Sequence, residues 1–246
     1  ILTTAKQHPD LSDREYRPWP LPDRKWLLRQ SWLNLSFLHW EIDYQDLRKR
    51  IPGTLDIDLH EGKAWIAIVP FDMRGVTLRH CPAFDPISNF PEINVRTYVT
   101  CNGKPGVWFF SLDVPSKFAV WAARTFFHLP YRHGYVKIQN KGNAVQYSSE
   151  VSDNRFRARY QPHHHEKFGK SSFEIWATER YCLYCQGSKG QLYRTEVHHQ
   201  QWPLQVASVD ILDNTLLDDF EIGEMHPSVL YSESIDVVAY WPEPIG

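Results

Sequence analysis

Short stretches of strand character recur along almost the whole chain, and this recurrence constrains the fold more than any other feature. Ten of them carry apolar and aromatic side chains between turn residues. Asn102 and Gly103 lie between two of these stretches, and Asn-Gly is a strong signal for a tight hairpin turn. The expected strands are 32–40, 63–73, 92–101, 106–113, 134–139, 144–150, 155–161, 179–186, 191–199 and 235–241.

Helical stretches are few. Tyr44–Arg50 is short and ends before Pro52, whereas Pro115–His128 repeats apolar residues at helical spacing and stops before Pro130. Many strands with one good helix predict a mainly antiparallel β architecture, closed as a barrel or folded as a sandwich, with one or two short helices. Aromatic residues make up 14% of the chain, which agrees with pleated, half-buried surfaces.

The chain of 246 residues fits one β domain preceded by an arm. Residues 1–25 are polar and punctuated by prolines, so we expect an extended N-terminal arm followed by a single domain over 26–246. The net charge of −2 and the pI of about 6.7 argue against a dedicated nucleic-acid or membrane surface. No apolar run approaches the roughly 18 residues that span a bilayer. Four cysteines are too few for a disulfide scaffold, so we expect a cytoplasmic protein with reduced thiols.

One predicted strand carries more chemistry than the others. Its alternating side chains place Glu92, Asn94, Arg96 and Tyr98 on one face. An acid, an amide, a guanidinium and a phenol can form a satisfied network inside a barrel, with Arg96 held against Glu92. The same face could instead point at water, and the pattern alone slightly favours that interpretation. The next strand is apolar on both faces at its start, which favours a polar-lined cavity within the fold.

Other polar groups could hold a metal ion, but a structural role is favoured for each. Cys182 and Cys185 have CxxC spacing, yet residues three apart in a strand face opposite sides and no second such pair completes a zinc site. His163–His165 lie in an expected flexible loop, where three successive histidines rarely bind one ion. Glu196 could pair with His198, although a satisfied inward histidine is the simpler expectation. We expect no metal and no cofactor.

Seven segments carry a resemblance to a known family. They are FPEINVRTYV at 90–99, ARTFFHLPY at 123–131 and VHHQQWPL at 197–204, together with 32–40, 65–73, 106–113 and 179–184. In this order, from about residue 26 onward, they resemble the bacterial YqjF-like family of unknown function. That family is in turn similar, more weakly, to the acetoacetate decarboxylase superfamily. The resemblance implies a single, mainly antiparallel β domain with a cone-like barrel and an internal ligand cavity.

The relatives that decarboxylate form a Schiff base with a lysine, whose pKa is lowered by desolvation and by a second cation. Where those relatives carry a lysine pair after an arginine and a proline, this chain keeps Arg124 and Pro130 but has Tyr131 and Arg132 instead of the lysines. Tyrosine cannot form an imine, and arginine stays protonated. The resemblance also matches Glu92 to an acid of the relatives' site. It therefore implies a related cavity without imine chemistry.

These observations predict a cavity that binds a small organic anion. The protein is then either an enzyme of lyase or decarboxylase-like type without the Schiff-base lysine, or a non-catalytic binding or sensor protein. A third alternative is a metal-dependent enzyme that uses the histidines. We expect neither a nucleic-acid nor a membrane partner. A homo-oligomer is expected only on the base rate for soluble proteins.

The expected roles of the residues follow from their chemistry. A carboxyl or phenol with a shifted pKa can transfer protons, and guanidinium groups suit carboxylates. Arg180, beside a run of aromatic residues, fits a structural ion pair and a ligand contact about equally. The predicted site comprises Glu92 and Tyr131 as catalytic groups, with Arg96, Arg132, Asn94 and Tyr98 as substrate-binding groups.

Overall fold

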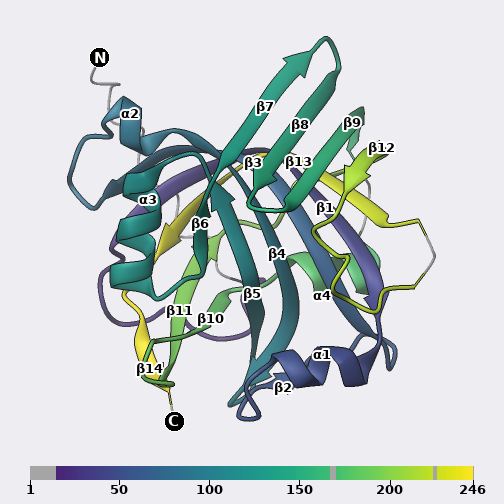
Figure 1. Ribbon diagram of the computed structural model, residues 1–246. Coiled ribbons are helices and arrows are strands. Elements are labelled where there is room, and N and C mark those ends of the chain that lie inside the picture. Colours follow the sequence, from purple (N-terminus) through teal and green to yellow (C-terminus); the bar gives the residue numbers. More distant parts are fainter. Residues whose placement is uncertain (1–14, 167–169, 224–225, 246) are drawn as a thin grey trace.

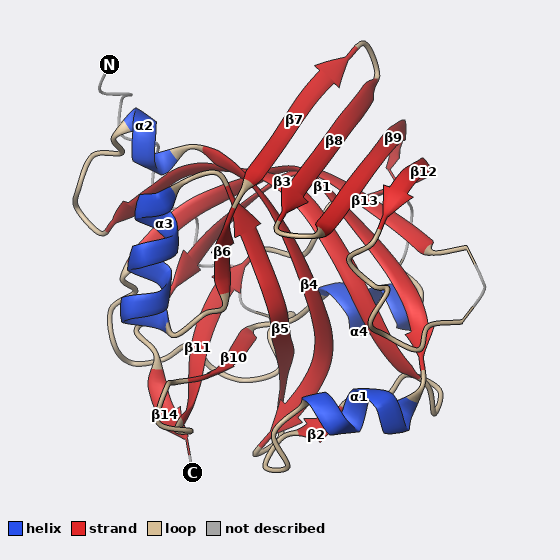
Figure 2. Cartoon of the chain, in the orientation of Figure 1, coloured by secondary structure: helices blue, strands red, loops and turns tan. Residues whose placement is uncertain are grey.

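The computed structural model describes residues 15–166, 170–223 and 226–245 (Figure 1). Strands dominate it, as Figure 2 shows, and the expected mainly β architecture is confirmed. The strands are β1 (Leu28–Ile42), β2 (Asp56–Ile57), β3 (Ala64–Leu78), β4 (Phe90–Cys101), β5 (Lys104–Val114), β6 (Tyr131–His133), β7 (Tyr135–Lys141), β8 (Ala144–Val151), β9 (Asn154–Glu166), β10 (Cys182–Gln186), β11 (Leu192–His199), β12 (Leu204–Asn214), β13 (Ser228–Ala239) and β14 (Glu243–Ile245). The helical elements are α1 (Tyr44–Arg50), α2 (Asp85–Ser88), α3 (Lys117–Ala122), the π-helical turn η1 (Ala123–Phe127) and α4 (Ser172–Thr178).

Part of the sheet closes into a ring. β11, β10, β5, β4, β3, β1 and β13 are hydrogen-bonded in this order, and β13 pairs back onto β11. Neighbours around the ring are antiparallel except β5 and β10, which are parallel. Beyond β13, the strands β12, β9, β8 and β7 continue the sheet away from the ring (Figure 1). The predicted barrel is therefore confirmed, with a sheet extension that the sequence did not indicate.

The extension begins at β13 because this strand divides one of its edges between two partners. Along the other edge it pairs with β1, from Ser228 opposite His39 to Ala239 opposite Leu28. On the shared edge, residues 230–232 pair with β12 and residues 237–239 pair with β11. One strand thus both closes the ring and starts the sheet that leaves it.

Strand β4 lies between two apolar cores. Ile93 and Val95 point outward and pack in a cluster with Tyr147 and Phe156, which belong to the sheet extension. On the opposite face, Tyr98 packs in the second cluster, inside the ring. Because both faces are covered, residues 92–99 are all buried. This arrangement decides the environment of the polar residues on β4.

The predicted hairpin turn is present between β4 and β5. Cys101 pairs with Lys104, so the loop contains only Asn102 and Gly103. Their φ angles are 52° and 71°, in the left-handed region that asparagine and glycine tolerate best. Two positive φ angles match the twist of the flanking strands, which explains why Asn-Gly was informative.

The two predicted helices are both found, but the second is irregular. α1 begins and ends where the sequence indicated, with Asp43 accepting a bond from the Asp46 N–H. The second continues from α3 into η1 and ends at His128, whose φ of 56° is left-handed. No helix within the described ranges is long and apolar enough to cross a membrane.

Several elements were not predicted, namely β2, β6, β12, β14, α2 and α4. Ser171 and Ser172, interpreted as signs of flexibility, instead lie at the start of α4, which begins at a capping box formed by Ser171 and Glu174. β12 also lacks a predicted counterpart, although its half-buried and exposed residues alternate as in a one-sided strand. α4 and β12 both have a physical signal in the sequence, and α4 becomes important for the site below.

Candidate functional site

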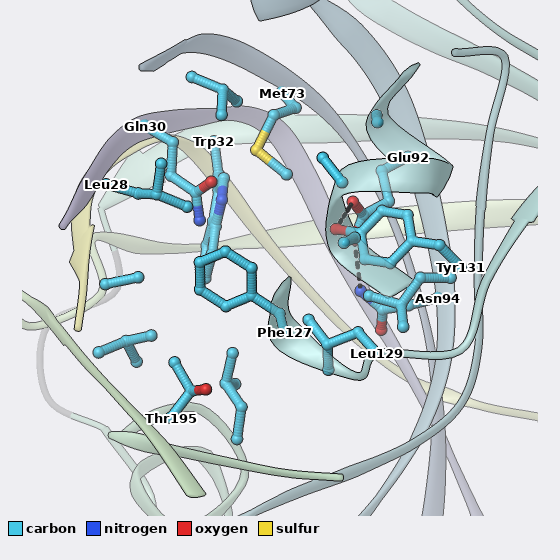
Figure 3. Close-up of a pocket in the computed structure, with 18 of the residues that line it drawn as sticks. Leu28, Gln30, Trp32, Met73, Glu92, Asn94, Phe127, Leu129, Tyr131 and Thr195 are labelled. Carbon is cyan, nitrogen blue, oxygen red and sulfur yellow. Dashed lines mark hydrogen bonds between the residues drawn. The ribbon is translucent and has the colours of Figure 1, made fainter. Parts of the chain in front are cut away.

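A cavity of about 640 Å³ is lined by the inner faces of ring strands, among them β1, β3, β4, β5 and β11. Residues of α2, α3 and η1 also line it, and most of the lining side chains are apolar or aromatic. Figure 3 shows Glu92, Tyr131 and Asn94 together on one side of this space, with Gln30 and Trp32 on another. Such a volume and lining are typical of a small-molecule site.

The polar face of β4 points into this cavity. Glu92, Asn94 and Arg96 all line it, and Glu92 is only 2% exposed and Arg96 8%. The interpretation that this face points at water, which the alternation slightly favoured, is therefore wrong. Alternation identifies two faces but cannot reveal that a second layer of sheet covers the apolar one.

Glu92 forms a hydrogen-bonded pair with Tyr131. The Tyr131 hydroxyl donates to Glu92 Oε2 at 2.7 Å, and Asn94 Nδ2 donates a longer bond of 3.5 Å to Oε1. Tyr131 reaches this position because β6 pairs with β5 directly after Pro130. Burial raises the pKa of Glu92 to about 7, although the bond from Tyr131 opposes the rise. Burial and the neighbouring carboxylate hold the pKa of Tyr131 well above its ordinary value.

The two pKa shifts give Glu92 and Tyr131 different roles. With a pKa of about 7, Glu92 exists in both protonation states near neutral pH and can take or give a proton. Tyr131 stays protonated and serves as a hydrogen-bond donor. The pair is thus suited to acid–base chemistry on a molecule in the cavity.

Arg96 is a buried cation with no acidic partner among the described residues. Within the described part of the chain it forms no ion pair, and its Nε has no hydrogen-bond partner. Its one bond runs from Nη2 to the Ala177 carbonyl of α4, at a long 3.5 Å. The guanidinium carbon instead lies 5.2 Å from the Phe37 ring centre and 5.8 Å from that of Tyr98. The predicted pairing of Arg96 with Glu92 is wrong, because Glu92 bonds to Tyr131 and Asn94 instead.

Arg180 supplies a second guanidinium to the cavity wall. Of the two alternatives left open above, the structural ion pair is present, since Nη1 pairs with Asp58, while Nη2 has no partner among the described residues. Its guanidinium carbon lies 5.0 Å from the ring centre of Tyr98 and 4.7 Å from that of Trp176. Arg96 and Arg180 therefore pack against the same ring, that of Tyr98.

Four further polar groups on the wall have no hydrogen-bond partner in the described ranges, and two of them can only donate. The indole N–H groups of Trp32 and Trp202 and the hydroxyl of Thr195 are buried without a partner in the described ranges, and so is the Asn94 carbonyl oxygen. Indole and guanidinium nitrogens can only donate. These residues were missed because single polar atoms in apolar strands leave no pattern in a sequence.

Two predicted substrate-binding residues do not line the cavity. Arg132 forms a two-bond ion pair with the buried Asp113, at 2.6 and 2.8 Å, and its side chain is 30% exposed. The physical reason is that neighbours in a strand point to opposite sides, so Tyr131 facing inward turns Arg132 away. Tyr98 lies behind the wall, where its hydroxyl is 2.7 Å from His39 Nε2. Tyr98 therefore supports the two arginines rather than lining the cavity with them.

The other polar groups have structural surroundings. Cys182 and Cys185 are both buried, which raises the pKa of each thiol to about 12. Glu196 accepts bonds from Arg17 and Lys104, each at 2.6 Å, so its carboxylate is held by cations. Within the described residues no group of three or more histidines, cysteines and carboxylates could hold a metal ion. His163–His165 belong to β9, so the expectation of a flexible loop is wrong for them, and of the three only the exposed His163 has a described side chain.

Solved structures with a similar fold include two of acetoacetate decarboxylases and one of an enduracididine biosynthesis enzyme. An acetoacetate decarboxylase structure superimposes with a TM-score of 0.62 at 16% identity, covering 90% of each chain. The acetoacetate decarboxylase from Legionella pneumophila gives 0.65 at 13% identity, covering 99% of this chain and 98% of the other. The enduracididine biosynthesis enzyme MppR, complexed with pyruvate, gives 0.65 at 13% identity, over 89% of this chain and 90% of the other. These likenesses establish the fold.

At the sequence level, the chain is 39% identical over 228 residues to the uncharacterized protein YqjF of Bacillus subtilis, which covers 90% of this chain and 93% of that protein. A profile of the DUF2071 family, described as "Uncharacterized conserved protein", matches residues 29–236. The match includes the whole polar face of β4, Tyr131 and Arg180. The chain belongs to this DUF2071 family, with an acetoacetate decarboxylase-like fold.

Proposed function

We propose that the cavity binds a small organic anion, and that Glu92, with Tyr131 as a hydrogen-bond donor beside it, transfers a proton to or from that anion. The observation that carries the proposal is Arg96, a buried guanidinium that lines the cavity and has no acidic partner in the described chain. A buried, unpaired charge is costly, so a bound anion would stabilise it. Arg180, with an unpartnered Nη2, adds a second donor on the same wall.

The other donors support an acceptor-rich ligand such as a carboxylate. Trp32 and Trp202 offer only N–H groups, and a carboxylate has two oxygens that accept several bonds. A protein of the same fold, MppR, forms a complex with pyruvate, which is a small carboxylate. Carboxylates are therefore the first class to test.

The proposed chemistry is proton transfer without an imine. Glu92 in its ionised state removes a proton from carbon, or in its protonated state delivers one to the carbanion that remains when CO₂ leaves. None of the described residues that line the cavity is a lysine, so no amine is in place to form a Schiff base. This favours a lyase or decarboxylase-like reaction of a different type.

Non-catalytic binding is the second candidate, and one distance favours it. Arg96 lies four residues from Glu92 on the same strand, which corresponds to roughly 13 Å at 3.3 Å per residue. A very short anion held at Arg96 would not reach the carboxyl group. Such a ligand would be bound or sensed without turnover.

The setting that we propose is the bacterial cytoplasm. All four cysteines are free, which suits a reducing compartment. A homo-oligomer and a separate N-terminal arm over residues 1–25 remain proposals of the same kind.

Binding can be tested by calorimetric titration of short-chain carboxylates and their 2-oxo and 3-oxo derivatives. Replacing Arg96 with methionine should weaken binding by about 10- to 100-fold, the value of a charge-assisted hydrogen bond. Arg157→Met is the matched control, because Arg157 is exposed on β9 and does not line the cavity. Equal losses in the two variants, or none in either, would contradict the proposal.

Catalysis can be tested separately by following exchange of the ligand's carbon-bound protons with D₂O by NMR. The wild-type protein should catalyse the exchange, and Glu92→Gln should abolish it while retaining most of the affinity. Exchange that persists in Glu92→Gln removes the assignment of the base. Binding without any exchange supports the non-catalytic alternative.

A further inference from the structure

The exposed apolar side chains of this protein gather at one place. Thirteen large hydrophobic residues are exposed within the described ranges, and seven of them line the cavity. Scattered single residues of this kind are ordinary, but a group on one opening is not. Since these seven are at once part of the cavity wall and in contact with solvent, they mark the mouth of the cavity.

Three segments contribute to this mouth. Phe84 and Ile87 come from α2 and the residue before it, with Leu78 close by in sequence at the end of β3. Phe118, Trp121 and Phe126 come from α3 and η1, where Trp121 is 54% exposed. Trp241 follows β13. We call these seven residues the aromatic mouth.

The α3 side of the mouth is weakly anchored to the core. Neither α3 nor η1 contains a single buried residue. Trp121 contacts both other rings: its ring centre lies 5.7 Å from that of Phe118 and 5.6 Å from that of Phe126. A helix that shows aromatic rings to both cavity and solvent is suited to an apolar ligand that passes it.

The charged end of the cavity lies elsewhere. Arg96 and Arg180 bond to the carbonyl groups of Ala177 and Trp176 in α4. Figure 1 shows α4 well separated from α3. The cavity therefore has a cationic region near α4, a wall that is mostly apolar, and an apolar mouth near α2 and α3.

We infer that the ligand is an amphipathic carboxylic acid, with its carboxylate at Arg96 and Arg180 and an unbranched apolar chain that runs toward the aromatic mouth. This inference rests on the proposed anion binding and adds the chemical class of the ligand's body. A short polar anion would leave the apolar wall and mouth in contact with water. A chain of several methylene groups covers that surface and also spans the distance from Arg96 past Glu92.

A chain-length series tests this inference directly. Calorimetry would compare sodium butyrate, octanoate and dodecanoate, below their micellar concentrations, with uncharged 1-octanol. Each buried methylene should tighten binding about fourfold, or on the order of 100-fold between butyrate and octanoate. Octanoate should bind at least about tenfold more tightly than 1-octanol, because only the acid uses the arginines.

The mouth itself is tested by the double variant Phe118→Ser and Trp121→Ser, since neither residue supports the core. It should weaken dodecanoate binding by about tenfold or more and leave butyrate binding unchanged. Leu212→Ser is the matched control, because Leu212 is 73% exposed on β12, outside the cavity lining. It should change neither affinity.

The outcomes separate the two proposals. Equal affinities for butyrate and octanoate, both reduced by Arg96→Met, overturn the amphipathic ligand but leave the anion site intact. Octanol binding as tightly as octanoate, with no effect of Arg96→Met, overturns both. If the double variant changes the sedimentation behaviour but not the dodecanoate affinity, the mouth is a contact between copies of the chain, and the inference fails.

Discussion

Glu92 is a carboxyl group that the fold keeps from water while leaving it a single strong donor, Tyr131. Its position on a polar strand face and its match to an acid in related proteins made it predictable. The prediction for Arg132 was wrong because the resemblance matches positions in the sequence only. The direction of a side chain depends on its place in the alternation of a strand, where neighbours point to opposite sides. Arg180 could not be assigned from sequence, because a partner such as Asp58 lies more than a hundred residues away.

At the residue scale, we predict that Glu92→Gln changes how stability depends on pH. The pKa of Glu92 in the folded protein is about 7, above its ordinary 4.5. The protonated form therefore favours the folded state, and this contribution is complete below about pH 4.5 and lost as the pH rises through 7. Glutamine does not titrate, so the variant does not lose stability in this way. Its unfolding free energy relative to that of the wild type should rise by up to about 3 kcal/mol between pH 5 and pH 8. Urea unfolding at both pH values measures the difference, and a constant difference would falsify the raised pKa.

At the element scale, α4 holds the two cavity arginines through its carbonyl groups, and the sequence interpretation missed this helix. Its capping box could have been recognised in the sequence from Ser171 and Glu174, which lie three residues apart. Gly169, Ser171 and Ser172 were interpreted as signs of flexibility instead. By contrast, the β4–β5 hairpin was predictable, since its turn depends on two adjacent residues only.

Removing the cap of α4 should weaken both the fold and the anion site. Ser171→Ala deletes the bond from the Glu174 N–H to the Ser171 hydroxyl, which should cost about 1 kcal/mol of stability. Because Arg96 and Arg180 bond to α4, carboxylate affinity should fall as well. Ser171→Thr keeps a capping hydroxyl and should restore both properties. A loss of affinity in the threonine variant equal to that in the alanine variant would contradict this explanation.

The seam between β5 and β10 makes a second prediction for an element. A Cβ on Gly106 would overlap the Cys182 carbonyl oxygen and lie 2.7 Å from the Tyr184 ring. Gly106→Ala should therefore destabilise the protein by about 2 kcal/mol or more, because the parallel strands must separate. Gly53→Ala is the control, with nothing within 4 Å of its added carbon. Equal melting temperatures for the two variants would show that the seam can relax.

At the scale of the whole molecule, the order of matching segments allowed a barrel to be predicted, whereas the pair of strands that closes the ring could not be predicted. Closure depends on β11 meeting β13, and no local pattern indicates that two particular strands will pair across the chain. The sheet extension is equally long-range. The cavity follows from both, since closure encloses it and the extension buries the back of β4.

The enclosed cavity leads to a chemical prediction for the molecule as a whole. Incubation with a 2-oxo or 3-oxo acid and then borohydride should leave the intact mass unchanged, because no lysine among the described residues lines the cavity. Mass spectrometry measures this outcome. A stable adduct on a lysine would show that imine chemistry survives in this chain, and peptide mapping would identify the residue.

The divided edge of β13 also bears on how the protein is made. Of the ring strands, β13 is the last in chain order, yet β1, the first, depends on it along nearly its whole length. As the chain leaves the ribosome, the edges of β1, β11 and β12 that pair with β13 remain unpaired until β13 emerges. Unpaired strand edges readily pair with other chains. Nascent chains halted before residue 228 should therefore bind to chaperones.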